Sequence, residues 1–585
     1  SPSLETMPST RTTPLPVSPS PLTPFSPGPN FLYMTPLIIL VVIPLAYGIF
    51  GVRRARLRSP IHFQQGTLGT SAWRAALSMA LIAIVPFTIW TIFVNSASAL
   101  LYLLGCFKAI VLVTLTTSNI LHYIPSPSVY TYIALRFHSR HLRTLLSSLQ
   151  VIVSLVSSYL LLHFCSLSIA SLTTLPVQAL TPLLAFSSLF AVLFSGQSNI
   201  MTPIYVTALT IAAAGLGMFI YFSVEDVTTL QALLPLRFSV APSLFSFILG
   251  FLFTLYQLTA SPTVYQLYFS LSTRHKLRLC FILYGVFLLS SGLFIFLLSS
   301  LYGDFLSKNC HLTYSLSSMF QFIKFTLHPN AFLSYTVCTA LHIIPLTILQ
   351  LLLLSSTSHI WEEFARCRFA SLSSGKQLAV LQIGTFLLCV LLTLTVLLLE
   401  YARWSLHLIV PMIFYFVSCF TTILATAFFV GHYLPFANSK GSLTALLLSF
   451  LFLALLASLH LLHNPMPTFQ TICRLTIETG VEHKTVSLSL AGPLLSRFVS
   501  SVAELPLYTH PLLLCALYIL SSTIISWATG GEDLFVLDWN LVVYVCGHLS
   551  PPLGKRRSFV ESESFRYAQQ RNTVRYPVDR QFLYG

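Results

Sequence analysis

Residues 378–400 read LAVLQIGTFLLCVLLTLTVLLLE, an apolar run whose one charged residue, Glu400, stands at its end. An α-helix rises about 1.5 Å per residue, so a run of this length can cross the roughly 30 Å of hydrocarbon in a bilayer. The strands of a membrane barrel are about half as long and alternate apolar with polar residues. The run therefore predicts a transmembrane helix.

Similar runs recur along most of the chain. Twelve more are predicted to span a membrane, at residues 33–52, 75–95, 98–121, 145–167, 176–195, 202–223, 242–260, 278–301, 332–356, 408–432, 442–463 and 509–529. Together they predict an all-α polytopic membrane protein with about 13 transmembrane helices.

The composition agrees with this class. Of the 585 residues, 55% are apolar and 8% are charged, and the mean hydropathy is +0.80. Soluble domains carry about a quarter charged residues, so these values exclude a soluble enzyme, a nucleic-acid-binding domain and a disordered protein. We expect the net charge of +15 to reflect basic loops on one side of the membrane.

The basic residues also predict how the spans are oriented. When the N-terminus is placed outside, more than two thirds of the Lys and Arg residues fall in inside loops, as the positive-inside rule requires. We therefore expect a disordered, Ser- and Pro-rich extracellular tail over residues 1–32, a membrane domain over 33–529 and a cytoplasmic tail over 530–585. The chain is expected to be a multi-pass protein of the plasma membrane.

Three residues stand out against this pattern. Lys108 lies inside a predicted span, where a charge is either functional or long enough to reach the interface. Cys310 and Cys473 fall in loops predicted to be outside, so they are candidates for a disulfide. The other cysteines lie mostly in apolar runs, where a thiol is usually a small core side chain.

Catalytic signatures are not found in the sequence. It contains no nucleophile paired with a base, no HExxH and no Gly-rich phosphate loop followed by Lys. No predicted span holds Asp or Glu away from its ends, which argues against a proton-pumping subunit of a respiratory complex. These observations indicate a transporter, channel or membrane receptor and no enzyme.

Four stretches of sequence help to decide between a transporter, a channel and a receptor. They are SVYTYIALRF at 128–137, LPFANSKG at 434–441, IWEEFAR at 360–366, and TRHK at 273–276 with the helix that follows as far as Cys310. They resemble motifs of the sodium/solute symporter family, in its branch of monocarboxylate, multivitamin and iodide carriers. The resemblance covers roughly residues 35–535 and marks a divergent member. Within it, Asn438 to Gly441 is expected to be a short cytoplasmic turn, and Glu362, Glu363 and Arg366 a solvated helix end.

The resemblance implies a LeuT-type fold of two inverted five-helix repeats. Such a fold binds solute and sodium near the bilayer midplane, where half-helix N-termini face an anion and unwound carbonyls replace the water around Na⁺. The implied partners are a sodium ion, which couples transport, and a small anionic solute, with no other cofactor.

Carried over to this chain, the family's sodium site is altered. Its two adjacent hydroxyl residues fall at Thr347 and Ile348, so one hydroxyl remains. The family's acid falls near Met201 to Ile204, where no acid stands, and Thr131 replaces a glutamate. Thr347 is a candidate sodium ligand, or an ordinary helix hydroxyl bonded to the preceding turn. Ser355 and Ser356 are candidates for a site rebuilt from its neighbours.

The sequence thus predicts a secondary active transporter that couples sodium to uptake of a monocarboxylate, vitamin or halide by alternating access. Two alternatives stay open. One is a symporter-like protein that has lost transport and acts as a receptor or scaffold. The other is a membrane subunit of a respiratory complex.

Overall fold

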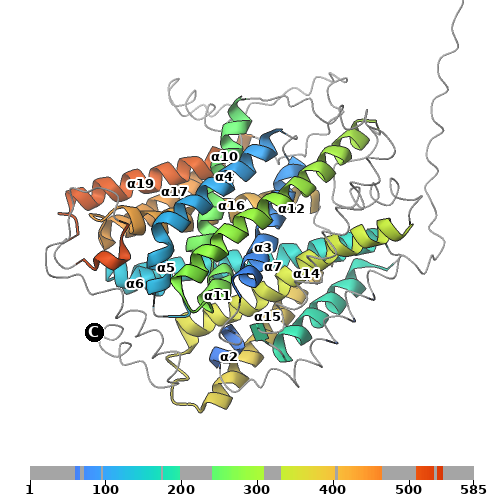
Figure 1. Ribbon diagram of the computed structural model, residues 1–585, viewed down its shortest axis with the longest axis horizontal. Coiled ribbons are helices and arrows are strands. Elements are labelled where there is room, and N and C mark those ends of the chain that lie inside the picture. Colours follow the sequence, from blue (N-terminus) through green and yellow to red (C-terminus); the bar gives the residue numbers. More distant parts are fainter. Residues whose placement is uncertain are drawn as a thin grey trace, which may run out of the picture.

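The computed structural model describes residues 60–65, 71–93, 97–124, 126–172, 175–194, 196–197, 240–308, 331–401, 406–463, 509–532 and 537–543, and three single positions before residue 60 (Figure 1). Within these ranges the regular structure is entirely helical. The all-α class predicted from the sequence is therefore confirmed for the described part of the chain.

The description of the helices covers only the ranges given above. In chain order they are α2 (Pro60–Gln65), α3 (Ala72–Phe93), α4 (Ala97–Leu112), the π-helical turn η2 (Val113–Thr117), α5 (Ser118–Tyr123), α6 (Thr131–Phe137), α7 (Arg140–Leu172), an unlabelled helix (Val177–Phe194), α10 (Val240–Thr259), α11 (Pro262–Phe269) and α12 (Arg274–Lys308). They continue with α14 (Ala331–Ile360), the π-helical turn η3 (Trp361–Ala365), α15 (Ser374–Tyr401), α16 (Leu406–Tyr433), α17 (Ser439–His463), α19 (His510–Ala528) and the short 3-10 helix η6 (Trp539–Leu541).

The predicted spans coincide with these helices. Nine described helices are long and apolar enough to cross a membrane, and α10 with α11 forms one more as a pair bent by 53°. The predicted span 75–95 is the apolar part of α3. The predicted spans 33–52 and 202–223 lie outside the described residues, so the total of about 13 stays a prediction.

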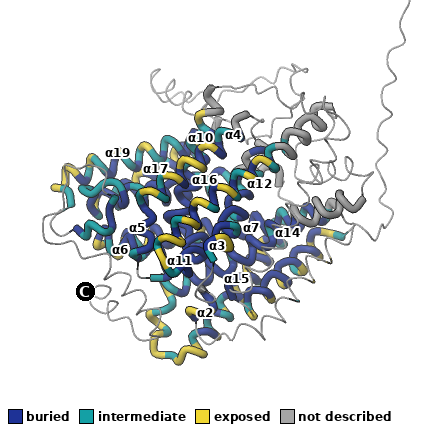
Figure 2. Tube along the Cα trace, viewed as in Figure 1, coloured by how far each residue is buried: buried dark blue, intermediate teal, exposed yellow. Residues whose placement is uncertain are grey.

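Burial separates inner from outer helices (Figure 2). The apolar window of α14 is 83% buried, whereas those of α15 and α17 are 33% buried. On α15 the exposed side chains form an apolar stripe, made of Ile383, Leu387, Leu391, Leu394 and Leu398. A contiguous stripe of this kind on a span faces lipid. Lys108 is exposed on α4, so it is not buried among the described helices.

A short helix ties distant segments together at one end of the bundle, which we call the α6 end. Arg136 of α6 is buried, and its guanidinium donates to the carbonyls of Gly431, Leu434, Pro435 and Ala437 at 2.9–3.2 Å. These carbonyls follow the last turn of α16, the negative end of that helix's dipole. Burial lowers the pKa of the Arg136 guanidinium from its ordinary range, but Arg keeps its charge at neutral pH.

A turn does join α16 to α17, but it covers residues 434–438, because Ser439 to Gly441 already form the first turn of α17. Its side of the membrane stays a prediction. Asn438 accepts the backbone N–H of Gly441 at 2.8 Å through its side-chain oxygen, and its amide donates to Thr529 at 2.7 Å. The turn is therefore fixed to the end of α19, and two of the four family-like stretches meet here through Arg136.

The predicted loop cysteines, the N-terminal tail and most of the C-terminal tail are outside the described residues. This holds for Cys310, Cys473, residues 1–32 and residues after 543, so the disulfide and the orientation of the termini stay predictions.

Helices α4 and α10 pack closely side by side (Figure 1). Gly105 of α4 lies against the carbonyl of Phe247, and Gly250 of α10 against the carbonyl of Tyr102. A Cβ at either glycine would overlap the partner's backbone. Small residues commonly allow this approach between membrane helices.

We expect Gly250→Ala to destabilise the protein by about 1–3 kcal/mol or more, because α4 and α10 must separate to admit the methyl group. Thermal unfolding in detergent measures this. Gly375→Ala is the matched control, since a Cβ there meets open space. Equal melting temperatures for the two variants would contradict the packing described here.

Candidate functional site

The bent pair α10–α11 is broken by the sequence Thr259-Ala-Ser-Pro262. Proline has no N–H and restrains the residue before it to extended backbone, and Ser261 is extended with φ −75° and ψ 118°. The N–H groups of Ala260 and Ser261 both donate to the carbonyl of Tyr256, at 2.8 and 3.0 Å. The break therefore leaves backbone groups inside the bundle without the hydrogen-bond partners that a continuous helix would provide.

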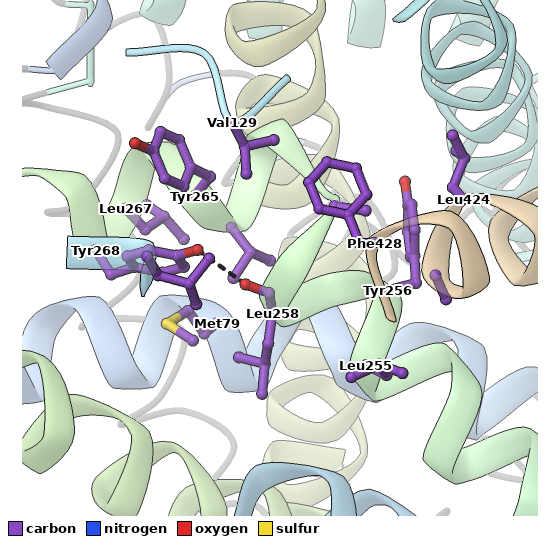
Figure 3. Close-up of a cluster of buried hydrophobic side chains, with 14 of the residues drawn as sticks. Met79, Val129, Leu255, Tyr256, Leu258, Tyr265, Leu267, Tyr268, Leu424 and Phe428 are labelled. Atoms are coloured by element: carbon purple, nitrogen blue, oxygen red, sulfur yellow. Dashed lines mark hydrogen bonds between the residues drawn. The ribbon is translucent and has the colours of Figure 1, made fainter. Parts of the chain in front are cut away.

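Side chains satisfy part of this opened backbone. The carbonyl of Leu258 accepts the hydroxyl of Tyr268 at 2.8 Å (Figure 3). Around this bond a dense cluster forms that includes Met79 of α3 and Leu424 and Phe428 of α16. The break is thus held between α3 and α16.

α2 and α3 are described as two separate helices. The two helices stand where one span would begin, and residues 66–70 between them are outside the described residues. The described part of the predicted span 75–95 belongs to the continuous helix α3, so it shows no unwound segment opposite Thr347.

A cavity of about 370 Å³ extends from the α10–α11 break toward the opposite end of the bundle. Its lining comes from α3, α4, α7, α10, α14 and α16, with contributions from α11 and α19. Most lining side chains are apolar, and none of them is charged. This size and character fit a small-molecule site, which is typically an apolar cavity with a few well-placed polar groups.

Part of the polar lining lies beside the break, at what we call the floor of the cavity, and Ser418, Thr421 and Thr422 of α16 supply further hydroxyls. The floor comprises Gln150, Ser154, Ser157, Tyr256, Gln257, Ser261 and Thr263. Gln150 of α7 accepts hydroxyl hydrogens from Tyr256 at 3.0 Å and from Tyr130 at 3.2 Å, and donates to Ser154 at 2.9 Å. Gln257 accepts the hydroxyl of Tyr284 at 3.1 Å. These groups form a hydrogen-bonded network rather than an ion pair.

Aromatic rings close the bundle below the floor. Tyr130 packs edge-on against Phe428, with ring centroids 5.4 Å apart, and Tyr132 stacks on the same ring at 5.7 Å. His432 follows at 4.4 Å from Tyr132. All of these side chains are buried, so the cavity is sealed at the α6 end.

A buried ion pair lies beyond the aromatic layer. Arg143 at the start of α7 donates to both carboxylate oxygens of Glu363 in η3, at 2.8 and 3.0 Å, and Ser128 donates to the same carboxylate. The Glu363 side chain is 3% exposed. The expectation of a solvated helix end is wrong for Glu363, because Arg143 from a distant helix covers and neutralises it. Glu362 and Arg366 do pair locally, at 2.8 Å.

The predicted sodium residues are all on α14, but they do not converge. Thr347 and Ser355 are eight residues apart, which is about 12 Å along a helix, so one ion cannot contact both. Ser355 shares a hydrogen bond with Thr263 at 2.6 Å. The hydroxyl of Ser356 is buried and has no hydrogen-bond partner among the described residues. Thr347 is buried, and its neighbour Ile348 lines the cavity.

Two further departures from the family pattern were noted in the sequence. Residues 201–204, where an acid is missing, are outside the described residues. Thr131, which replaces a glutamate, opens α6, and its hydroxyl lies 3.4 Å from the Arg143 guanidinium. The carboxylate that Arg143 binds comes from Glu363 instead.

Sequence reasoning did not find the floor of the cavity. Gln150, Tyr256 and Gln257 lie in apolar runs, where their partners cannot be read from spacing. The Ser-Pro step at 261–262 was the available signal, because a proline just past the end of a predicted span marks a helix break.

Comparison with known proteins adds the following. No protein-family model and no curated protein matches the chain. Among solved structures, a substrate-bound, outward-open Na⁺-coupled sialic acid symporter is similar, at 14% identity over 86% of this chain and 99% of that one, with a TM-score of 0.66. A manganese transporter mutant from Eremococcus coleocola aligns over 86% and 97% at 13% identity, but its TM-score is 0.39. The described chain therefore has the fold of the Na⁺-coupled sialic acid symporter, an all-α polytopic membrane protein.

Proposed function

We propose that this chain is a secondary active transporter that moves a small anionic solute by alternating access, coupled to sodium. The observation that carries the proposal is the cavity beside the α10–α11 break, which is sealed at the α6 end. Binding at a broken helix in the middle of a bundle is how transporters of this architecture hold solute. Covalent chemistry has no part in the proposal.

The cavity favours an organic solute among the three classes expected from the sequence. A volume of about 370 Å³ with a largely apolar lining is larger than a halide needs, and suits a carboxylate with an apolar body. A monocarboxylate or a vitamin acid is therefore preferred over iodide.

Sodium coupling rests on the resemblance and on Thr347. Ile348 and the distance from Thr347 to Ser355 count against a site rebuilt along α14. The same two observations favour the alternative, a receptor or scaffold that has lost transport. A respiratory subunit would need buried Lys and Glu in series, and among the described spans Lys108 is exposed and Glu363 is neutralised at one end.

The first test is uptake of labelled pyruvate, biotin and iodide into proteoliposomes that contain the full chain. We expect uptake of at least one carboxylate, faster with an inward sodium gradient than with an equal choline gradient. If none of the three enters under either gradient, the transport proposal fails. Binding without uptake would favour the receptor alternative.

A second test concerns the coupling ion. We expect Thr347→Ala to raise the sodium concentration for half-maximal uptake several-fold, because one ligand hydroxyl is lost. Thr393→Ala on α15 is the matched control, since its buried hydroxyl donates only to the Cys389 carbonyl, at 2.8 Å. An unchanged sodium dependence in the Thr347 variant would show that this hydroxyl is not a ligand.

A third test concerns the seal at the α6 end, which alternating access must open. Glu363→Gln leaves Arg143 buried without its partner. We expect it to speed labelling of a Val129→Cys reporter by a membrane-impermeant maleimide at least threefold. Val129 is fully buried in the aromatic seal, and the exposed Cys367 is replaced by Ser beforehand.

Two further variants keep this test decisive. Glu362→Gln, which removes the local pair with Arg366, serves as the control and should leave labelling unchanged. The double variant Arg143→Gln with Glu363→Gln removes both charges and avoids the stability loss of one unpaired charge. Slow labelling in a well-folded double variant would mean that the ion pair does not hold this end closed.

A further inference from the structure

The floor of the cavity contains two glutamines with similar hydrogen bonds. The side-chain oxygen of Gln150 accepts from the hydroxyls of Tyr130 and Tyr256, and the oxygen of Gln257 accepts from the hydroxyl of Tyr284. The tyrosines come from three different parts of the chain. Both amides are therefore oriented by residues outside their own helix turns.

These hydrogen bonds determine which end of each amide, oxygen or nitrogen, is left to face the solute. An amide oxygen has two lone pairs, and on Gln150 two phenols occupy both. The Gln150 nitrogen carries two hydrogens, of which one goes to Ser154 at 2.9 Å. Its second hydrogen, and the nitrogen of Gln257, have no hydrogen-bond partner among the residues that the structure describes. Both glutamines line the cavity, so each offers it an N–H donor.

The start of α11 adds further donors beside these amides, whereas Ser418, Thr421 and Thr422 of the cavity lining spend their hydroxyl hydrogens on carbonyls of α16. Thr263 stands in the first turn of α11, whose N–H groups lack helical carbonyl partners and form its positive end. No acidic residue lines the cavity, and no Lys or Arg does. A ligand whose polar end only accepts hydrogen bonds fits this floor, whereas an ammonium group would find N–H groups that repel it.

We propose that Gln150 and Gln257 determine the specificity of this cavity by binding the carboxylate of the solute through their N–H groups. Tyr130, Tyr256 and Tyr284 act as positioning residues. The inference rests on the proposed transport function only in taking the cavity as the solute site. It assigns carboxylate recognition to neutral amides, in a cavity whose lining provides no fixed cation.

The test is calorimetric titration of the purified full chain with benzoate and benzylamine. These probes have the same ring and opposite charges at pH 7. We expect benzoate to bind and benzylamine to bind at least tenfold more weakly, because a hydrogen bond to a charged group in a closed site changes affinity by about that factor or more. Similar affinities for the two probes, or no binding of either, would overturn the inference.

Variants connect the preference to the amides. Gln150→Glu keeps the shape and still accepts from both phenols, but it replaces the N–H with an anionic oxygen. We expect it to weaken benzoate binding at least tenfold. Gln382→Glu is the matched control on α15, where the amide donates to the Leu193 carbonyl at 2.9 Å away from the cavity lining. It should leave benzoate binding unchanged.

The positioning role has its own readout. Tyr256→Phe keeps the ring and frees one lone pair of the Gln150 oxygen, so the amide can turn its oxygen toward the solute. We expect the ratio of the two dissociation constants to shift toward benzylamine by at least threefold, with an unchanged melting temperature. A shift in melting temperature with a constant ratio would mean that Tyr256 has only a structural role.

This inference and the transport proposal fail separately. Benzoate binding that depends on Gln150, in a protein that takes up no solute, would leave the inference standing and remove transport. Sodium-driven uptake in a protein whose Gln150→Glu variant binds benzoate as tightly as the wild type would do the reverse.

Discussion

The constraint behind this architecture is that hydrocarbon offers no hydrogen bonds, so backbone groups in the membrane must find partners within the protein. Continuous helices meet it along nine described spans. At Thr259 to Pro262 the helix cannot continue, and Tyr256 and Tyr268 take up part of the freed backbone through one carbonyl and one hydroxyl. The cavity lies beside this break, where helical hydrogen bonds alone do not satisfy all of the backbone groups.

Buried charges at the α6 end must likewise find their partners within the protein. Arg136 is satisfied by four carbonyls around the end of α16, and Arg143 by a bidentate pair with Glu363. The first arrangement joins the start of the chain's membrane domain to its late helices. The second joins α7 to the end of α14. If either arginine lost its partners, a charge would be left unpaired in a medium of low dielectric constant. The helices that each arginine joins are therefore expected to move together.

The sequence predicts the helices far better than the site, for a physical reason. A span depends on local hydropathy, so runs such as 378–400 are visible without any partner. The state of Glu363 depends on Arg143, 220 residues away, and spacing around Glu363 suggested only a solvated end. Gln150 likewise gains its role from Tyr130 and Tyr256. Thr347 was placed by the family resemblance and Ser355 was suggested as a neighbour on the same run, but helix geometry places them about 12 Å apart.

The neutral lining of the cavity bears on why such a protein would couple to a cation. An anion that leaves water for a cavity of N–H donors keeps hydrogen bonds but loses the compensation of a fixed positive charge, and burial of uncompensated charge is costly. A fixed Lys or Arg would remove that cost and also hold the solute after the helices had moved. A mobile cation that binds with the anion lowers the same cost and then leaves. On this argument, the proposed amide recognition of the carboxylate and the proposed symport with sodium would be two parts of one electrostatic solution.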